Sequence, residues 1–148
     1  MKSWLYFIVF SLMLGIHLMC IAQLPKDTYG QCISSYSADA SYLQEFPVKP
    51  DEFHNTAKGP FVKYSMMLSK NTVYRFALCV GDHPEVLPVM QLFNTSSQIA
   101  SNFNQETGNI FKSFDFVCQK TDVYHLIISY PDGRKGNALA VLWYLKTL

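Results

Sequence analysis

Cysteine and histidine are the residue types in this sequence with the greatest potential for covalent chemistry. A nucleophilic enzyme needs a thiolate beside a base and an orienting group. Cys79 or Cys118 with His83 or His125 would supply the first two groups. Both cysteines nevertheless lie in apolar, strand-like runs, where buried thiols are typical. The sequence therefore favours a protein that is not an enzyme, and we assign no catalytic residues.

One loop groups two carboxylates around an imidazole. Its residues are Asp82, His83, Pro84 and Glu85. A zinc site requires further histidine or cysteine ligands nearby, whereas Asp and Pro are common turn formers. We expect a solvated turn here, with no bound metal and no cofactor.

A polar loop over residues 102–107 places amide side chains beside an aromatic ring. Asn102 and Asn104 flank Phe103 in this loop. A carbohydrate site uses a few polar groups for hydrogen bonds and an apolar surface for stacking. An ordinary loop is also polar, so a carbohydrate-binding domain is an alternative function rather than the leading one.

Three cysteines, Cys32, Cys79 and Cys118, follow the N-terminal apolar segment. An oxidising compartment would allow one disulfide and leave one thiol. Cys79 and Cys118 both lie in predicted strands and are the candidate pair. The alternative is that all three are small buried apolar residues, as free cysteines often are.

Residues 1–22 have the features of a secretory signal peptide. Lys2 precedes an apolar stretch that ends in Cys20-Ile21-Ala22, and cleavage there would make Gln23 the first mature residue. The alternatives are a retained membrane anchor, because a span needs about 20 apolar residues, and a lipidated Cys20. The segment resembles the signals of exported Bacteroidetes proteins. We expect a protein of the periplasm or of the extracellular surface, without a transmembrane span after cleavage. Association with the outer membrane is one of the locations that this expectation includes.

The length and composition of the chain limit the classes of protein to which it can belong. The chain has 148 residues, of which 49% are hydrophobic and 16% charged, and its formal net charge is +1. This length suits one domain of ordinary size. A near-neutral chain without a basic run lacks the charge pattern of a nucleic-acid-binding protein. The high aromatic share, 15%, favours strands over a helical bundle.

From residue 60 onward, short β-prone runs alternate with turn residues. The predicted strands are 61–68, 72–80, 87–93, 98–102, 112–118, 123–130 and 138–145. Turn residues such as Ser69-Lys70-Asn71 and Pro131-Asp132-Gly133 separate them. About seven strands at spacings near ten residues predict an all-β fold, an antiparallel and jelly-roll-like sandwich over 60–148.

Residues 23–59 are predicted to be a leader segment that packs on the sandwich. Four apolar residues would line one face of a short helix over 34–45: Tyr36, Tyr42, Leu43 and Phe46. Pro47 and Pro50 would end this helix.

Adjacent aromatic residues, Trp143 and Tyr144, lie in the last predicted strand. Successive side chains of a strand point to opposite faces. We therefore expect one of the two to be exposed or to be covered by the leader. Exposed aromatic residues on a small domain often mark a protein contact, so this strand or its edge is a candidate docking surface.

Three segments carry a family resemblance. They are the turn and Tyr-x-Phe strand at 69–76, the strand-turn-strand at 89–102, and the aromatic strand at 114–116 that leads to the Val-Tyr-x-Leu strand at 123–126. Together they resemble bacterial prepeptidase C-terminal-type (PPC-like) sandwiches and, more loosely, lumenal GOLD domains. The resemblance implies a module for binding or targeting. Asp122 stands where such turns usually carry Gly, and no calcium-holding acidic pair is evident, so calcium binding is not carried over.

The leading interpretation is an exported, non-catalytic binding or accessory module. It would be a subunit of an envelope or secretion-associated assembly, with a protein partner in the cell envelope. The export signal and the sandwich pattern support this interpretation. A carbohydrate-binding domain and a cysteine-dependent enzyme or redox protein are the two alternatives.

Overall fold

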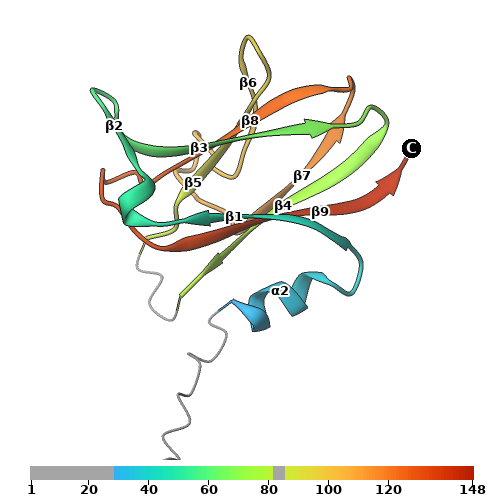
Figure 1. Ribbon diagram of the computed structural model, residues 1–148, viewed down its shortest axis with the longest axis horizontal. Coiled ribbons are helices and arrows are strands. Elements are labelled where there is room, and N and C mark those ends of the chain that lie inside the picture. The colour runs from blue at the N-terminus through green and yellow to red at the C-terminus, as the bar shows by residue number, and fades with distance from the viewer. Residues whose placement is uncertain (1–28, 82–85) are drawn as a thin grey trace, which may run out of the picture.

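Two antiparallel β-sheets packed face to face form the body of the protein (Figure 1). The computed structural model describes residues 29–81 and 86–148. The predicted signal peptide and the Asp82–Glu85 loop lie outside the described residues. The described elements are α2 (Gly30–Tyr36), β1 (Ser41–Val48), the 3-10 turn η2 (Pro50–Glu52), β2 (His54–Thr56), β3 (Gly59–Leu68), β4 (Thr72–Val80), β5 (Val89–Phe93), β6 (Gln98–Ser101), β7 (Ser113–Cys118), β8 (Asp122–Ser129) and β9 (Ala138–Thr147). The predicted all-β sandwich is confirmed.

The sandwich consists of a four-stranded and a five-stranded sheet. The first sheet has the order β1-β9-β4-β7, and the second has the order β2-β3-β8-β5-β6. The β3–β4 and β7–β8 turns therefore cross between the sheets, and both lie at the same end of the sandwich. Lys70 N donates to Thr121 Oγ1 at 2.9 Å and ties the two turns together. Asn71 adopts a positive φ of 61°, which asparagine tolerates better than most residues.

The space between the sheets is filled by alternate side chains of nearly every strand. The largest fully buried ones in this core include Phe46, Phe76, Leu78, Met90, Leu92, Leu126 and Ile128. Phe76 and Phe114 stack with ring centroids 5.1 Å apart. The Tyr64 hydroxyl donates to the Pro47 carbonyl and so links β3 of the second sheet to β1 of the first. This alternation is the pattern of a sheet with one face against a core.

Strand β9 departs from that alternation because both of its faces are covered. Its first six residues, Ala138–Trp143, are all buried. On the outer side of the first sheet, a second apolar cluster contains Ala77, Cys79, Leu139, Val141 and Trp143, and we call this surface the covered face. A strand buried on both sides shows a continuous apolar run rather than alternation.

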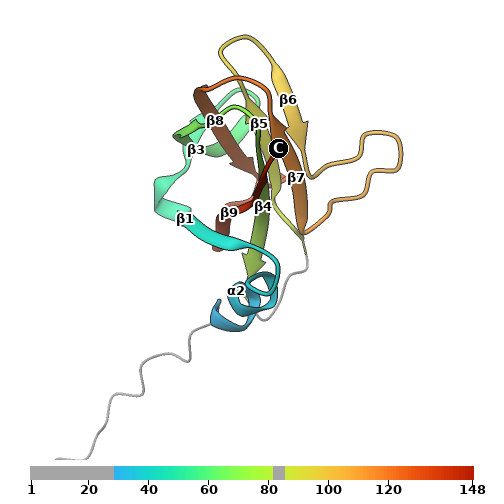
Figure 2. The same ribbon diagram turned by 90° about the vertical axis from the view of Figure 1, so that its right-hand side faces the viewer.

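Helix α2 and the residues around it form the cover of this face (Figure 2). A disulfide joins Cys32 of α2 to Cys79 of β4, with a Cα–Cα distance of 5.6 Å. Arg75 of β4 adds a second tie, because it binds Asp39, in the connection between α2 and β1, at 3.2 Å. Asp115 of β7 holds the same guanidinium group at 2.7 Å. A seven-residue helix without a side-chain cap is too short to be stable alone, so the disulfide and these contacts hold it in place.

The predicted disulfide between Cys79 and Cys118 is wrong. Cys118 pairs in register with Thr72, seven residues along β4 from Cys79, and a strand rises about 3.3 Å per residue. The two side chains also face opposite ways, since Cys79 belongs to the covered face and Cys118 to the core between the sheets. Cys118 is a free, buried thiol.

The predicted helix over 34–45 is also wrong beyond Tyr36. Residues Ser41–Val48 form β1, which pairs with β9 and directs Phe46 and Val48 into the core. The segment 23–59, expected to be a leader, thus contributes β1 and β2 to the two sheets. Pairing with β9 overrides the helical spacing of the local apolar residues.

Candidate functional site

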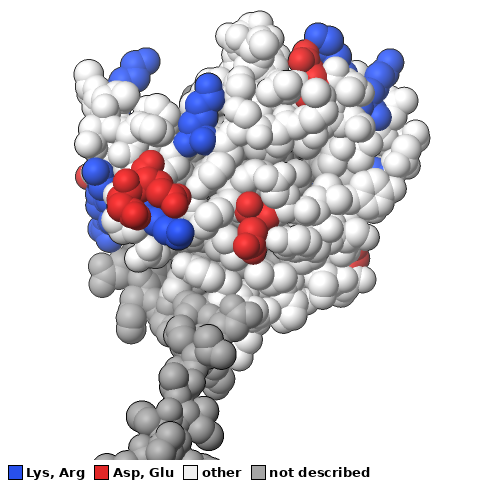
Figure 3. Space-filling view, viewed as in Figure 1, with Lys and Arg blue, Asp and Glu red and all other residues white. Residues whose placement is uncertain are grey.

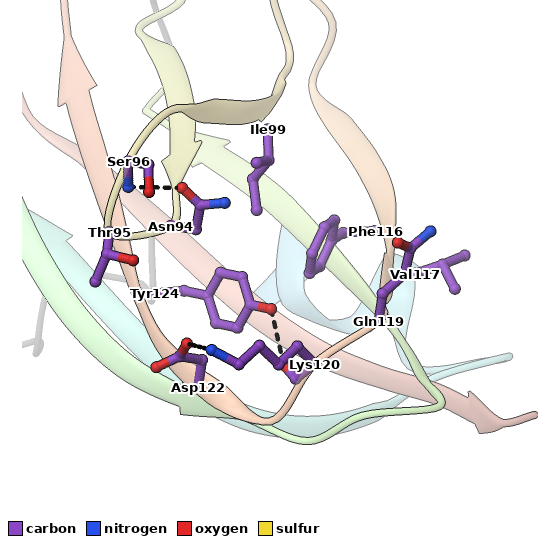
Figure 4. Close-up of a pocket in the computed structure, with 10 residues that line it drawn as sticks. All are labelled: Asn94, Thr95, Ser96, Ile99, Phe116, Val117, Gln119, Lys120, Asp122 and Tyr124. Atoms are coloured by element: carbon purple, nitrogen blue, oxygen red, sulfur yellow. Dashed lines mark hydrogen bonds and ion pairs between the residues drawn. The ribbon is translucent and has the colours of Figure 1, made fainter.

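A cleft of about 480 Å³ opens at the end of the sandwich, and we call it the end cleft (Figure 4). It lies between the β5–β6 turn and the β7–β8 turn. Its lining residues are Asn94, Thr95, Ser96, Ile99, Phe116, Val117, Gln119, Lys120, Asp122 and Tyr124. The volume falls within the range of roughly 300–1,000 Å³ that small-molecule sites occupy.

Three apolar side chains form the floor of the end cleft. Phe116 of β7 meets Tyr124 of β8 edge to face, with ring centroids 5.6 Å apart. Ile99 of β6 packs against the same core, and Figure 4 shows these three side chains between the two turns. The Tyr124 hydroxyl donates to the Lys120 carbonyl at 2.8 Å, so the ring is fixed.

The β5–β6 turn forms one rim of the cleft and is stabilised by Asn94. The Asn94 Oδ1 atom accepts hydrogen bonds from the backbone N–H groups of Ser96 and Ser97, both at 2.8 Å. This is the turn that asparagine favours through its own side chain. The amide nitrogen of Asn94 points away from these bonds in Figure 4, which leaves a donor at the rim.

The β7–β8 turn forms the opposite rim and carries an ion pair. Lys120 Nζ lies 2.7 Å from Asp122 Oδ2, and Asp122 Oδ1 accepts from the Val123 N–H at 2.9 Å. The hydrogen bond to Asp122 raises the pKa of Lys120, and the bond from Lys120 lowers the pKa of Asp122. Both groups therefore stay charged around neutral pH, and their formal charges cancel.

Beneath the cleft, Tyr124 contacts the free thiol. Cys118 Sγ lies 3.6 Å from the Tyr124 hydroxyl and 3.1 Å from the Lys120 carbonyl oxygen. Burial, followed by the hydrogen bond to Cys118, raises the pKa of Tyr124 to about 12. The phenol thus remains neutral at any physiological pH.

The aromatic pair predicted to contact a partner occupies the covered face and its border. Trp143 is only 1% exposed and packs against Tyr36 and Tyr42 at centroid distances of 6.3 and 5.7 Å. Tyr144 is half-buried, and its hydroxyl lies 3.0 Å from Thr147 Oγ1. We expected one of the two to be exposed or to be covered by the segment 23–59, and for Trp143 the second alternative holds, because Tyr36 and Tyr42 of that segment pack on it. Trp143 is therefore not an exposed docking residue.

The polar loop predicted as a sugar site uses its amides internally. Asn102 is 1% exposed and bonds to Met90 N, Pro88 O and Phe111 O at 2.7–3.2 Å. Asn104 Oδ1 accepts from two backbone N–H groups of its own turn. Phe103 is 36% exposed. Asn102 therefore anchors the loop and is not available to a ligand.

The structure does not bring together the described cysteines and the described histidine that were considered for catalysis. Cys79 is bonded to Cys32, and Cys118 faces the core. His125 lies on β8 between two core-facing residues and is hydrogen-bonded through Nδ1 to Ser65 Oγ at 2.8 Å, on the outer side of the second sheet. His83 lies outside the described residues.

A second exposed feature is the free edge of β1. Tyr42 and Leu43 are 48% and 47% exposed there, next to an irregularity in the pairing with β9 between Tyr42 and Gln44. Figure 3 shows that much of the surface on this side of the molecule is uncharged. Exposed apolar residues on an edge strand are suited to contact with another protein.

Within the described ranges, no group of three potential metal ligands is close enough to hold an ion. Nor does that part of the chain contain a helix long and apolar enough to cross a bilayer.

Neither a protein-family model, nor a curated protein, nor a solved structure matches this chain. The resemblance to PPC-like and GOLD-like sandwiches therefore stays a prediction.

Proposed function

We propose that the protein is an exported, non-catalytic binding module whose ligand site is the end cleft. The observation that carries this proposal is the cleft itself. It combines an apolar floor with a neutral polar rim, and each rim is a turn held by its own hydrogen bonds. Such preorganised concave sites lose little conformational entropy when they bind.

The disulfide supports export. Disulfides form and persist in oxidising compartments and are rare in the cytoplasm, and Cys32–Cys79 holds the cover of the first sheet in place. Together with the apolar segment before Ala22, it favours the periplasm or the extracellular surface. Mass spectrometry of the exported protein should find Gln23 at its N-terminus, whereas a retained or lipidated Cys20 would contradict the proposed cleavage.

The positions of the cysteines favour binding over catalysis. A nucleophilic cysteine must be a thiolate that substrate can reach. Cys79 is held in the disulfide, and Cys118 is completely buried in the core. Alkylation of the folded protein at neutral pH should therefore label neither residue, and rapid labelling of Cys118 would favour the cysteine-dependent alternative.

A role as an accessory subunit of an envelope assembly is the second candidate, favoured by the exposed Tyr42 and Leu43 on β1. The test is affinity capture from gently solubilised envelopes with the protein tagged at its C-terminus, which leaves this edge free. We expect a stoichiometric envelope protein that Leu43→Ser no longer retains. Recovery of the tagged protein alone, with both forms folded, would contradict the accessory role and leave a soluble ligand-binding module.

A further inference from the structure

We propose that the end cleft binds a neutral, hydroxyl-rich ring, that is, one unit of a carbohydrate. This inference rests on the proposed function, because it names the ligand class of the same cleft. Three features carry it: the charge balance of the lining, the apolar floor, and the hydrogen-bonding groups on the two rims.

The charge balance of the lining favours a neutral ligand. Lys120 and Asp122 are the charged residues among those that line the cleft, and they bind each other at 2.7 Å. A phosphate or carboxylate would have to compete with Asp122 for the ammonium group, and a cation would have to displace that group from Asp122. A neutral polar ligand can bond to both groups without breaking the pair.

The floor provides a surface for the C–H face of a sugar ring. Phe116 and Ile99 are partly exposed at the floor, and the buried Tyr124 meets Phe116 edge to face. Apolar and aromatic surface of this kind supplies most of the contact area in small-molecule sites, while a few polar groups fix the orientation.

The two rims provide those polar groups from side chains. Asn94 offers an amide N–H on one rim, and Gln119 offers a complete amide on the other (Figure 4). Amides and hydroxyls such as that of Thr95 both donate and accept, which matches the hydroxyls of a sugar. An extended peptide is instead held mainly by the backbone of a strand edge, and these rims are turns.

A titration of the exported, disulfide-bonded protein tests the inference. Backbone amide shifts would be recorded by NMR with neutral oligosaccharides of glucose, galactose, mannose and N-acetylglucosamine. We expect at least one of them to give saturable shifts at residues 94–99 and 116–122, and none within α2. The absence of saturable shifts with all four at millimolar concentration would overturn the inference, and so would shifts confined to another surface.

Rim variants sharpen the titration. Gln119→Ala removes an exposed amide, and Asn94→Asp keeps the turn-stabilising oxygen but removes the donor. Each should weaken sugar binding about tenfold, the effect of losing one well-placed hydrogen bond. Gln105→Ala, in the exposed loop that does not line the cleft, is the matched control and should bind as the wild type does. Equal binding by all four proteins would overturn the inference.

Failure of this inference can be separated from failure of the proposed function. If no neutral sugar binds but a substitution that fills the cleft still abolishes capture of an envelope component, the cleft is a binding site for another ligand class. If neither sugars nor envelope components depend on the cleft, both proposals fail.

Discussion

The covered face and the end cleft lie on the same sandwich, but the apolar side chains of the first are buried and those of the second are partly exposed. On the covered face, a disulfide attaches α2, Arg75 binds Asp39 in the connection that follows α2, and Trp143 is buried beneath this cover. At the end cleft, Phe116 and Ile99 remain partly open between two turns. The difference supports a stabilising role for the first surface, and it leaves the second accessible, as the proposed binding site requires.

The largest effect should follow from emptying the covered face. Trp143→Ala removes the largest side chain of that cluster, and we expect it to lower the free energy of unfolding by about 3–5 kcal/mol. Urea denaturation followed by circular dichroism measures this change. Trp143→Phe is the matched control and should retain most of the stability. A Trp143→Ala protein as stable as the wild type would contradict the stabilising role of the covered face, since Trp143 would then contribute nothing to the free energy of unfolding.

Removing the disulfide should have the next largest effect. The Cys32–Cys79 bond has a sequence separation of 47, for which the chain-entropy model gives about 4 kcal/mol as an upper value. We expect Cys32→Ser with Cys79→Ser to lose about 2–4 kcal/mol. Trp143 fluorescence should report the loosened cover. Dithiothreitol should reproduce the loss in the wild type and have no effect on the double variant; sensitivity of the double variant would contradict this account.

Alkaline pH should loosen the base of the end cleft through Tyr124. Its pKa of about 12 in the folded protein exceeds the value of about 10 for an unfolded chain. The stability due to the neutral phenol is therefore complete below pH 10 and is lost as the pH rises toward 12. Three other tyrosines, Tyr42, Tyr64 and Tyr130, also have raised pKa values, so the wild type is compared with Tyr124→Phe. The variant should lose less stability in this window, and parallel curves would contradict the role of Tyr124.

The smallest effect on stability is expected at the rim of the cleft. Gln119 is exposed, and exposed substitutions of this kind usually change the free energy of unfolding by less than about 0.5 kcal/mol. Thermal denaturation of Gln119→Ala should therefore match that of the wild type. A large loss of stability would show that the rim is structural, like the covered face, and would remove the distinction between the two regions.

Local patterns in the sequence were sufficient to predict most strands of the sandwich. Short β-prone runs bounded by turn residues predicted the seven strands from β3 to β9, because those strands have strong apolar signals and clear breaks. The strand β1 was missed since Tyr36, Tyr42 and Phe46 also fit a helical spacing. Pairing with β9 makes this segment a strand rather than a helix. Because β9 lies about a hundred residues away in the sequence, a local pattern cannot detect this pairing.

The candidate site was less predictable than the fold. The turns at 94–97 and 120–122 were expected individually, but their approach around one cleft depends on strand order and on connections between sheets. The buried role of Asn102 was likewise hidden, because an asparagine in a polar loop looks the same whether it bonds to ligand or to backbone. The cysteine pairing required knowledge of which face each strand residue occupies.

The most direct test of the central claim is affinity capture from gently solubilised envelopes with three proteins. They are the wild type, Gln119→Trp, which places a large ring at the rim of the end cleft, and Gln105→Trp, which places the same ring on a loop that does not line the cleft. We predict that the wild type and Gln105→Trp retain the same envelope component, identified by mass spectrometry as one that Leu43→Ser on the β1 edge also retains, and that Gln119→Trp loses it. Equal retention by all three folded proteins would contradict the assignment of the end cleft as the binding site.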